Sequence, residues 1–76
     1  MSNIASVIAR DDMTLSVTFE NGRQVIFDVK PYLGGEAFLP LQDPAEFKKV
    51  SNGCYFIEWD CGADFSADTI EAFALK

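Results

Sequence analysis

The clearest pattern in the chain is a strict alternation of apolar and polar residues along residues 13–19, which read Met-Thr-Leu-Ser-Val-Thr-Phe. Leu15, Val17 and Phe19 fall on one face, and hydroxyl side chains fall on the other. Successive side chains of a strand point to opposite faces of a sheet, so this pattern predicts a half-buried β-strand. Two neighbouring runs predict further strands, at residues 4–10 and 23–29.

The turn between the second and third predicted strands decides which side chains share a face. The Asn-Gly dipeptide suggests a two-residue turn, but that register would place Val25 and Phe27 among the polar side chains. A three-residue loop that ends at Gly22 instead pairs Val17 with Val25 and Leu15 with Phe27. A slip of one residue moves every side chain to the other face, so we predict the three-residue loop, with Gly22 left-handed and forming a bulge.

Two helix starts follow further along the chain. Residues 43–46, Asp-Pro-Ala-Glu, combine an N-cap, a proline at the first helical position and a glutamate at the third. This short helix is expected to end at the Asn-Gly pair before Cys54. Ser66 can cap a C-terminal helix, whose apolar stripe contains Ile70 and Phe73.

Residues 54–59, Cys-Tyr-Phe-Ile-Glu-Trp, are apolar on both faces and predict a central or covered strand. Within it, Cys54 is expected to pack as a small hydrophobic residue. Trp59 is either a core residue, which we favour, or a binding anchor. The sequence thus predicts an α+β fold: an antiparallel sheet of about four strands, with one short helix and a C-terminal helix on one face.

Composition narrows the class of protein. The chain has 76 residues, of which 49 % are hydrophobic and 13 % aromatic. This content predicts a single domain over residues 1–76 and excludes disorder as the default. The N-terminus lacks a secretory pattern, and no apolar run approaches the ~20 residues of a membrane span, so we expect a cytoplasmic protein with no membrane partner.

The residue types and the net charge disfavour enzymatic activity, metal binding and direct binding to nucleic acid. Histidine is absent, so the usual general base at neutral pH is missing, and Cys61 beside Asp60 has no histidine partner to lower the pKa of its thiol. Cys54 and Cys61 do not form a C-x-x-C pair and are expected to be free thiols. The net charge of −6 disfavours direct binding to nucleic acid. We therefore predict no enzymatic activity, no cofactor and no metal.

Acidic residues gather near the C-terminal end. Within residues 58–71 there are five carboxylates and no Lys or Arg: Glu58, Asp60, Asp64, Asp68 and Glu71. Three of them recur every four residues, but they do not follow a calcium-loop pattern, so solvated charges are favoured over a metal cluster. The cluster is either a solubilising surface or a patch complementary to a basic groove on another protein.

A second group of candidate contacts is apolar. Tyr32, Leu33 and Phe38 flank a stretch that contains one proline and two glycines and is expected to be a flexible loop. These side chains either make apolar contacts with a partner or cap the core.

Several of these motifs resemble a small bacterial family, domain-of-unknown-function family 2442. The likeness covers nearly the whole chain and is carried by residues 15–22, 25–28, 38–41, Phe47 and 57–65. The last of these, from Ile57 to Phe65, is similar to the Trp–Gly–Asp signature that precedes a terminal helix in that family. The resemblance implies a small β-meander with helices and no established chemistry. It also implies, by association only, a role as the acidic partner of a small toxin-like protein.

In size and charge alone, the chain is also similar to phage anti-CRISPR proteins, many of which are single acidic domains that occupy nucleic-acid sites. These observations predict a non-enzymatic acidic domain that inhibits a basic partner by occluding its nucleic-acid site. The partner would be a CRISPR effector subunit, a toxin or another nucleic-acid-binding protein. The alternative is a small interaction module whose acidity serves only solubility.

Overall fold

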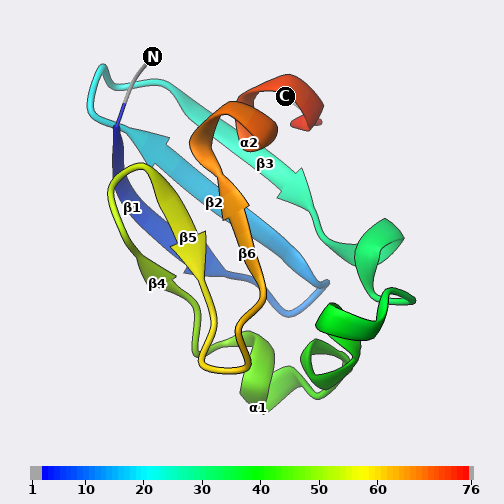
Figure 1. Cartoon of the computed structure of the whole chain (residues 1–76). Helices are drawn as coiled ribbons and strands as arrows, with labels where there is room; N and C mark the ends of the chain where they lie inside the picture. The colour runs from blue at the N-terminus through cyan, green and yellow to red at the C-terminus, as the bar shows by residue number, and fades with distance from the viewer. Residues whose placement is uncertain (1–2, 76) are drawn as a thin grey trace.

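The strands form two sheets rather than one. A computed structural model describes residues 3–75 and contains two three-stranded antiparallel sheets (Figure 1). The first sheet has the order β1 (Ile4–Ala9), β2 (Thr14–Phe19) and β3 (Gln24–Asp28), and the second has the order β4 (Ser51–Asn52), β5 (Phe56–Glu58) and β6 (Asp64–Ser66). The fold is therefore of mixed α and β type, but the prediction of one sheet of about four strands is wrong.

The first sheet confirms the predicted hairpin register. Val17 lies opposite Val25, and Leu15 lies opposite Phe27. Gly22 has a φ of 91°, a value that favours glycine, and its N–H donates to the carbonyl of Phe19 at 2.9 Å. The three-residue loop therefore places the large apolar side chains of both strands on one face, where they are fully buried.

The second sheet differs from the prediction because its turns are built by local polar contacts. The Asn52 side chain accepts the N–H of Cys54 at 2.8 Å, and Cys54 has a φ of 74°. This conformation begins a turn, so β5 starts at Phe56, and Cys54 is exposed rather than packed as a small hydrophobic residue. The short helix ends at Phe47, and the chain then forms β4, where the sequence predicted the helix to continue.

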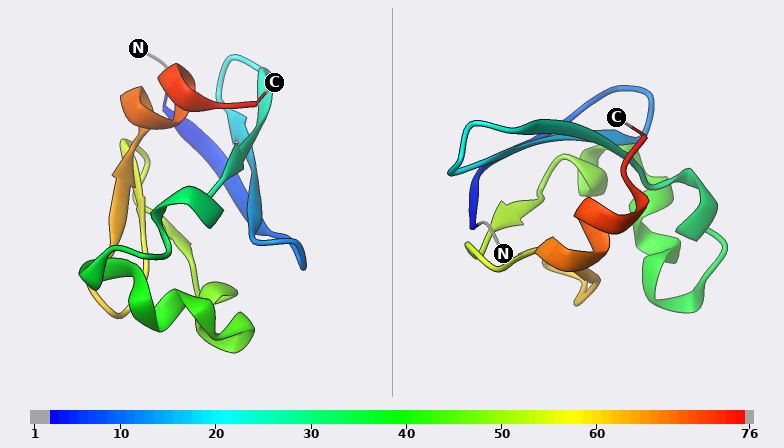
Figure 2. Two further views of the ribbon diagram at one scale, coloured as in Figure 1. Left: turned by 90° about the vertical axis from the view of Figure 1, so that its right-hand side faces the viewer. Right: turned by 90° about the horizontal axis from the view of Figure 1, so that it is seen from above.

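Both helix starts are confirmed. The Asp43 carboxylate accepts the Ala45 N–H at 3.0 Å at the start of α1 (Pro44–Phe47), and the Ser66 hydroxyl accepts the Thr69 N–H at 3.2 Å at the start of α2 (Ala67–Phe73). The stretch expected to be a flexible loop instead contains two 3₁₀ helices, η1 (Lys30–Tyr32) and η2 (Glu36–Gln42). Figure 2 shows the two sheets as two layers, with α2 at one end.

The core lies between the two layers. Trp59 is 3 % exposed, and its Nε1 donates to the carbonyl of Phe47 at 2.8 Å, which confirms that it is a core residue. The rings of Phe27 and Phe65 meet edge to face across the layers, with centroids 4.8 Å apart. Main-chain contacts also join the layers at one side, where the N–H of Ile4 donates to the carbonyl of Cys54 at 2.7 Å.

Candidate functional site

Two of the predicted carboxylates lie directly opposite each other on the second sheet. Glu58 of β5 is the antiparallel partner of Asp64 of β6, and both residues are exposed. Their neighbours Ile57 and Phe65 point to the opposite face and are buried. Directly opposed side chains have Cβ atoms about 4.5–5.5 Å apart, and like charges in that position are destabilising. The outer face of this sheet therefore carries two negative charges at close range.

Asp68 adds a third carboxylate at the end of the same strand. It lies in the first turn of α2, which follows β6 directly, and it is exposed. A negative charge at this position is favoured by the helix dipole. Among residues 3–75, no Lys or Arg forms an ion pair with Glu58, Asp64 or Asp68. We call these three residues the acidic face.

The other two predicted members of the cluster have basic neighbours. Glu71 is half-buried, and its Oε2 lies 3.6 Å from a guanidinium nitrogen of Arg23. Asp60 is exposed in the turn that joins β5 to β6. The pKa of the Lys49 ammonium is raised, chiefly by its hydrogen bond to Glu46, with a smaller contribution from the charge of Asp60. The five predicted carboxylates therefore divide into three that form no ion pair within residues 3–75 and two that lie near cations.

The other basic side chains in residues 3–75 lie near carboxylates outside the acidic face. Lys30 pairs with Asp28 at 3.1 Å, and Lys48 pairs with Asp11 at 3.0 Å. Arg10 borders an open hollow near the end of β1, together with both residues of the Lys48–Asp11 pair. None of the basic side chains in residues 3–75 therefore forms an ion pair with Glu58, Asp64 or Asp68.

The predicted apolar contacts are not part of the acidic face. Tyr32, Leu33 and Phe38 are half-buried and pack against the core. The ring centroid of Tyr32 lies 5.0 Å from that of Phe65, and the ring centroid of Phe38 lies 5.1 Å from it. Phe65 points inward, whereas its neighbour Asp64 is exposed, so the two predicted groups of contact residues do not form one surface.

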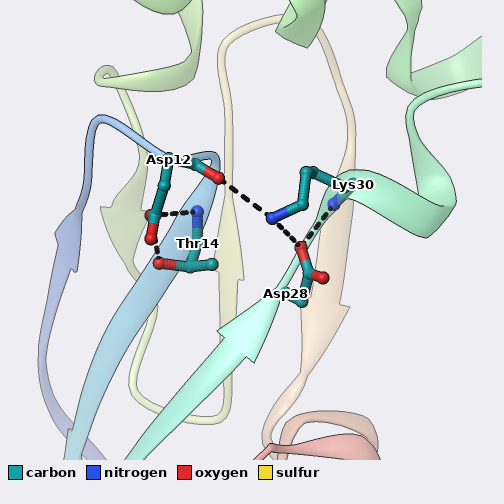
Figure 3. Close-up of polar contacts among 4 residues, drawn as sticks. All are labelled: Asp12, Thr14, Asp28 and Lys30. Carbon is teal, nitrogen blue, oxygen red and sulfur yellow. Dashed lines mark hydrogen bonds and ion pairs between the residues drawn. The ribbon is translucent and has the colours of Figure 1, made fainter.

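A polar network that the sequence analysis missed closes the turn between β1 and β2 (Figure 3). One oxygen of the Asp12 carboxylate accepts both the N–H and the hydroxyl of Thr14, and the Lys30 ammonium donates to the Asp12 carbonyl at 3.2 Å. The Thr14 hydroxyl is the main reason that the pKa of Asp12 lies below its ordinary value of 3.8. Thr14 is 4 % exposed, so its hydrogen bonds to Asp12 stabilise the turn. Asp12 itself is exposed and borders the open hollow beside Arg10. The Asp-x-Thr spacing was the available signal.

Metal ligands, cysteines and membrane-spanning helices were also considered in the part of the chain that the structure describes. Within residues 3–75, no three His, Cys, Asp or Glu side chains are placed to hold a metal ion together. Cys54 and Cys61 are both exposed free thiols. None of the helices in residues 3–75 is long and apolar enough to cross a membrane. The acidic face is the candidate functional site because its three carboxylates are exposed and form no ion pair within residues 3–75.

Comparison with known proteins identifies the family. Residues 4–75 match the family described as protein of unknown function (DUF2442), so the chain belongs to that family and the predicted resemblance is confirmed. Comparisons with curated proteins and with solved structures found no match. The likeness to anti-CRISPR proteins is not shown by any of these comparisons.

Proposed function

We propose that this member of the DUF2442 family is a non-enzymatic protein-binding domain whose acidic face binds a basic surface of a partner protein. One observation carries the proposal: Glu58 and Asp64 lie directly opposite each other, exposed and without an ion pair in residues 3–75. A Lys or Arg of a partner placed between these carboxylates would interact with both. The repulsion between them in the free protein would then be relieved on binding.

The charge of the whole chain supports the same partner chemistry. A net charge of −6 repels acidic proteins and phosphate backbones, and it attracts basic surfaces. Exposed charges of this kind act mainly on the rate of encounter, which complementary potentials can raise roughly 10- to 1,000-fold. Recognition would therefore be fast and sensitive to salt.

The finer proposal is that the partner surface is one that binds nucleic acid. Proteins bind phosphate backbones through clustered Lys and Arg side chains, and the acidic face would be attracted to the same clusters. Occupation of such a groove by this domain would block the nucleic acid, as expected of an antitoxin-like or anti-CRISPR-like inhibitor. If the acidity serves only solubility, no partner will depend on the acidic face.

The test is capture from the native host with the immobilised domain, followed by a competition assay. Wild type is compared with Asp64→Lys/Asp68→Lys and with the matched control Glu20→Lys/Glu36→Lys, whose carboxylates are exposed and form no ion pair in residues 3–75. Both double variants change the net charge from −6 to −2. We expect a basic protein that wild type and control retain and the acidic-face variant loses.

The captured protein is then tested for binding to nucleic acid in the presence of the domain. Loss of that binding supports inhibition, and unchanged binding refutes the finer proposal while leaving the protein-binding role. Equal capture by both double variants would show that the acidic face is only a solvated surface. Circular dichroism of each variant establishes that it is folded.

A further inference from the structure

The first sheet has an open edge at β1. The N–H of Arg10 donates to the carbonyl of Thr14 at 2.9 Å, and antiparallel partners alternate between hydrogen-bonded and non-hydrogen-bonded pairs. Ser6 and Ile8 are therefore bonded to β2, and the main-chain groups of Val7 and Ala9 point away from it. Those four groups form no hydrogen bond to another element within residues 3–75.

The start of β1, which packs beside β4, and the opposite edge of the sheet are both closed by hydrogen bonds. The main-chain groups of Ile4 are both used, because its N–H donates to the carbonyl of Cys54 and its carbonyl accepts from the Asn52 side chain at 2.9 Å. On the opposite edge of the sheet, the N–H of Leu75 donates to the carbonyl of Ile26 at 2.8 Å. In Figure 1, β1 is the outer strand of its sheet on the side away from β3.

The open part of β1 contains none of the residues that usually protect an edge strand, and charged residues begin beyond its end, where Arg10 and the Lys48–Asp11 pair border a hollow beside Ala9. Natural edges are protected by charged residues, proline or bulges, and an unprotected edge is a template for pairing with another strand. Residues 4–9, Ile-Ala-Ser-Val-Ile-Ala, contain no charge and no proline, and the bulge lies before the open part, between Ile4 and Ser6. Ile8, between the two outward-facing residues, is 62 % exposed.

We propose that two copies of the chain pair through this edge, antiparallel, about a two-fold axis at Ile8. In this register Val7 of each copy lies opposite Ala9 of the other. The outward main-chain groups of both copies are then satisfied by four hydrogen bonds, and a six-stranded sheet results. Ile8 lies opposite Ile8 of the second copy at a non-hydrogen-bonded position, where side chains approach most closely.

A second copy fits this edge better than an unrelated strand for two reasons. An isologous interface needs a self-complementary surface, and a two-fold axis at Ile8 gives each outward group of one copy its counterpart on the other. Each copy carries a net charge of −6, and the uncharged run of residues 4–9 lets the two chains meet without opposing carboxylates. The acidic face lies on the other sheet, so this inference does not depend on the proposed function.

The first test measures oligomeric state by analytical ultracentrifugation between about 10 µM and about 1 mM protein, a range suited to a small interface. Wild type should form dimers within it. Ile8→Lys places two like charges across the axis and should be monomeric. The control Leu75→Lys also replaces an exposed aliphatic side chain with lysine, at a residue that is 63 % exposed. This control should dimerise as wild type does. A monomeric wild type, or a dimeric Ile8→Lys variant, overturns the proposal.

The second test fixes the register with cysteines in a Cys54→Ser/Cys61→Ser background under mild oxidation. Opposed residues at a non-hydrogen-bonded position have Cα atoms about 4.5 Å apart, which lies within the range of a disulfide. Ile8→Cys should therefore yield a cross-linked dimer. Ser6→Cys should not, because two such residues would be offset by about 13 Å at ~3.3 Å per residue. Equal cross-linking of the two variants overturns the two-fold register at Ile8.

Discussion

The Trp59 side chain joins the second sheet to α1, and its replacement by phenylalanine should show how much this contact stabilises the fold. The indole Nε1 donates to the buried carbonyl of Phe47 at 2.8 Å, and the two rings stack with centroids 5.9 Å apart. Phenylalanine removes the donor and leaves that carbonyl without its partner, which costs about 1–3 kcal/mol. The smaller ring also leaves a void that costs about 1 kcal/mol.

The free energy of unfolding of Trp59→Phe should therefore fall by about 2–4 kcal/mol, against a total of roughly 4–11 kcal/mol for a domain of this size. Urea unfolding followed by circular dichroism measures the change. With an m-value of about 1 kcal/mol/M, the midpoint should fall by about 2 M or more. The control Tyr55→Phe alters a residue that is 62 % exposed and should change stability by less than ~0.5 kcal/mol. A loss below about 1 kcal/mol for Trp59→Phe would contradict the assigned hydrogen bond.

Three further predictions concern the turns and the charge. The Thr14 hydrogen bonds lower the pKa of Asp12 below 3.8, so their stabilisation is complete above that pH and is lost as the pH falls through the lowered value. Urea midpoints measured down to about pH 2 should show this loss of stability, and the loss should be smaller in Asp12→Asn. An identical pH profile for the variant and wild type would argue against the network. Gly22→Ala introduces a side chain at a φ of +91° and should cost about 1 kcal/mol or more in denaturant unfolding. Gly34→Ala has open space and no such φ and should be nearly neutral, and equal losses would refute the turn geometry. In gel shifts at about 100 mM salt, the protein alone should form no complex with DNA or RNA at about 10 µM, and tight, salt-sensitive binding would refute the proposed partner chemistry.

The first sheet was predictable because neighbouring residues in the chain determine its strands and its turn. The alternation in β2 fixes which side chains are buried, and the requirement that Val25 and Phe27 join that face determines the turn. The second sheet was not predictable in this way. β4 has two residues and β6 has three, so neither shows a period, and each depends on its pairing with β5. The turn at Cys54 is set by the Asn52 side chain, which competes locally with strand formation.

The sequence predicted that carboxylates are concentrated between Glu58 and Glu71, but it did not predict which of them share one surface. The sequence shows no basic residue between Glu58 and Glu71, yet the fold brings Arg23, from the connection between β2 and β3, to Glu71. It also brings Lys49 near enough to Asp60 for the two charges to interact. Such pairings join segments distant in the chain, and only the packed structure distinguishes carboxylates that have cations beside them from those that do not.

The most direct test of the acidic face is an NMR titration of the ¹⁵N-labelled protein with an oligolysine peptide. We predict amide shift changes concentrated at Glu58, Asp64 and Asp68, which weaken as salt is raised from about 50 to about 300 mM and are lost in Asp64→Lys/Asp68→Lys. Changes of equal size at Glu20 and Glu36 would contradict the account, because they would show that cations do not prefer the acidic face to any other exposed carboxylate.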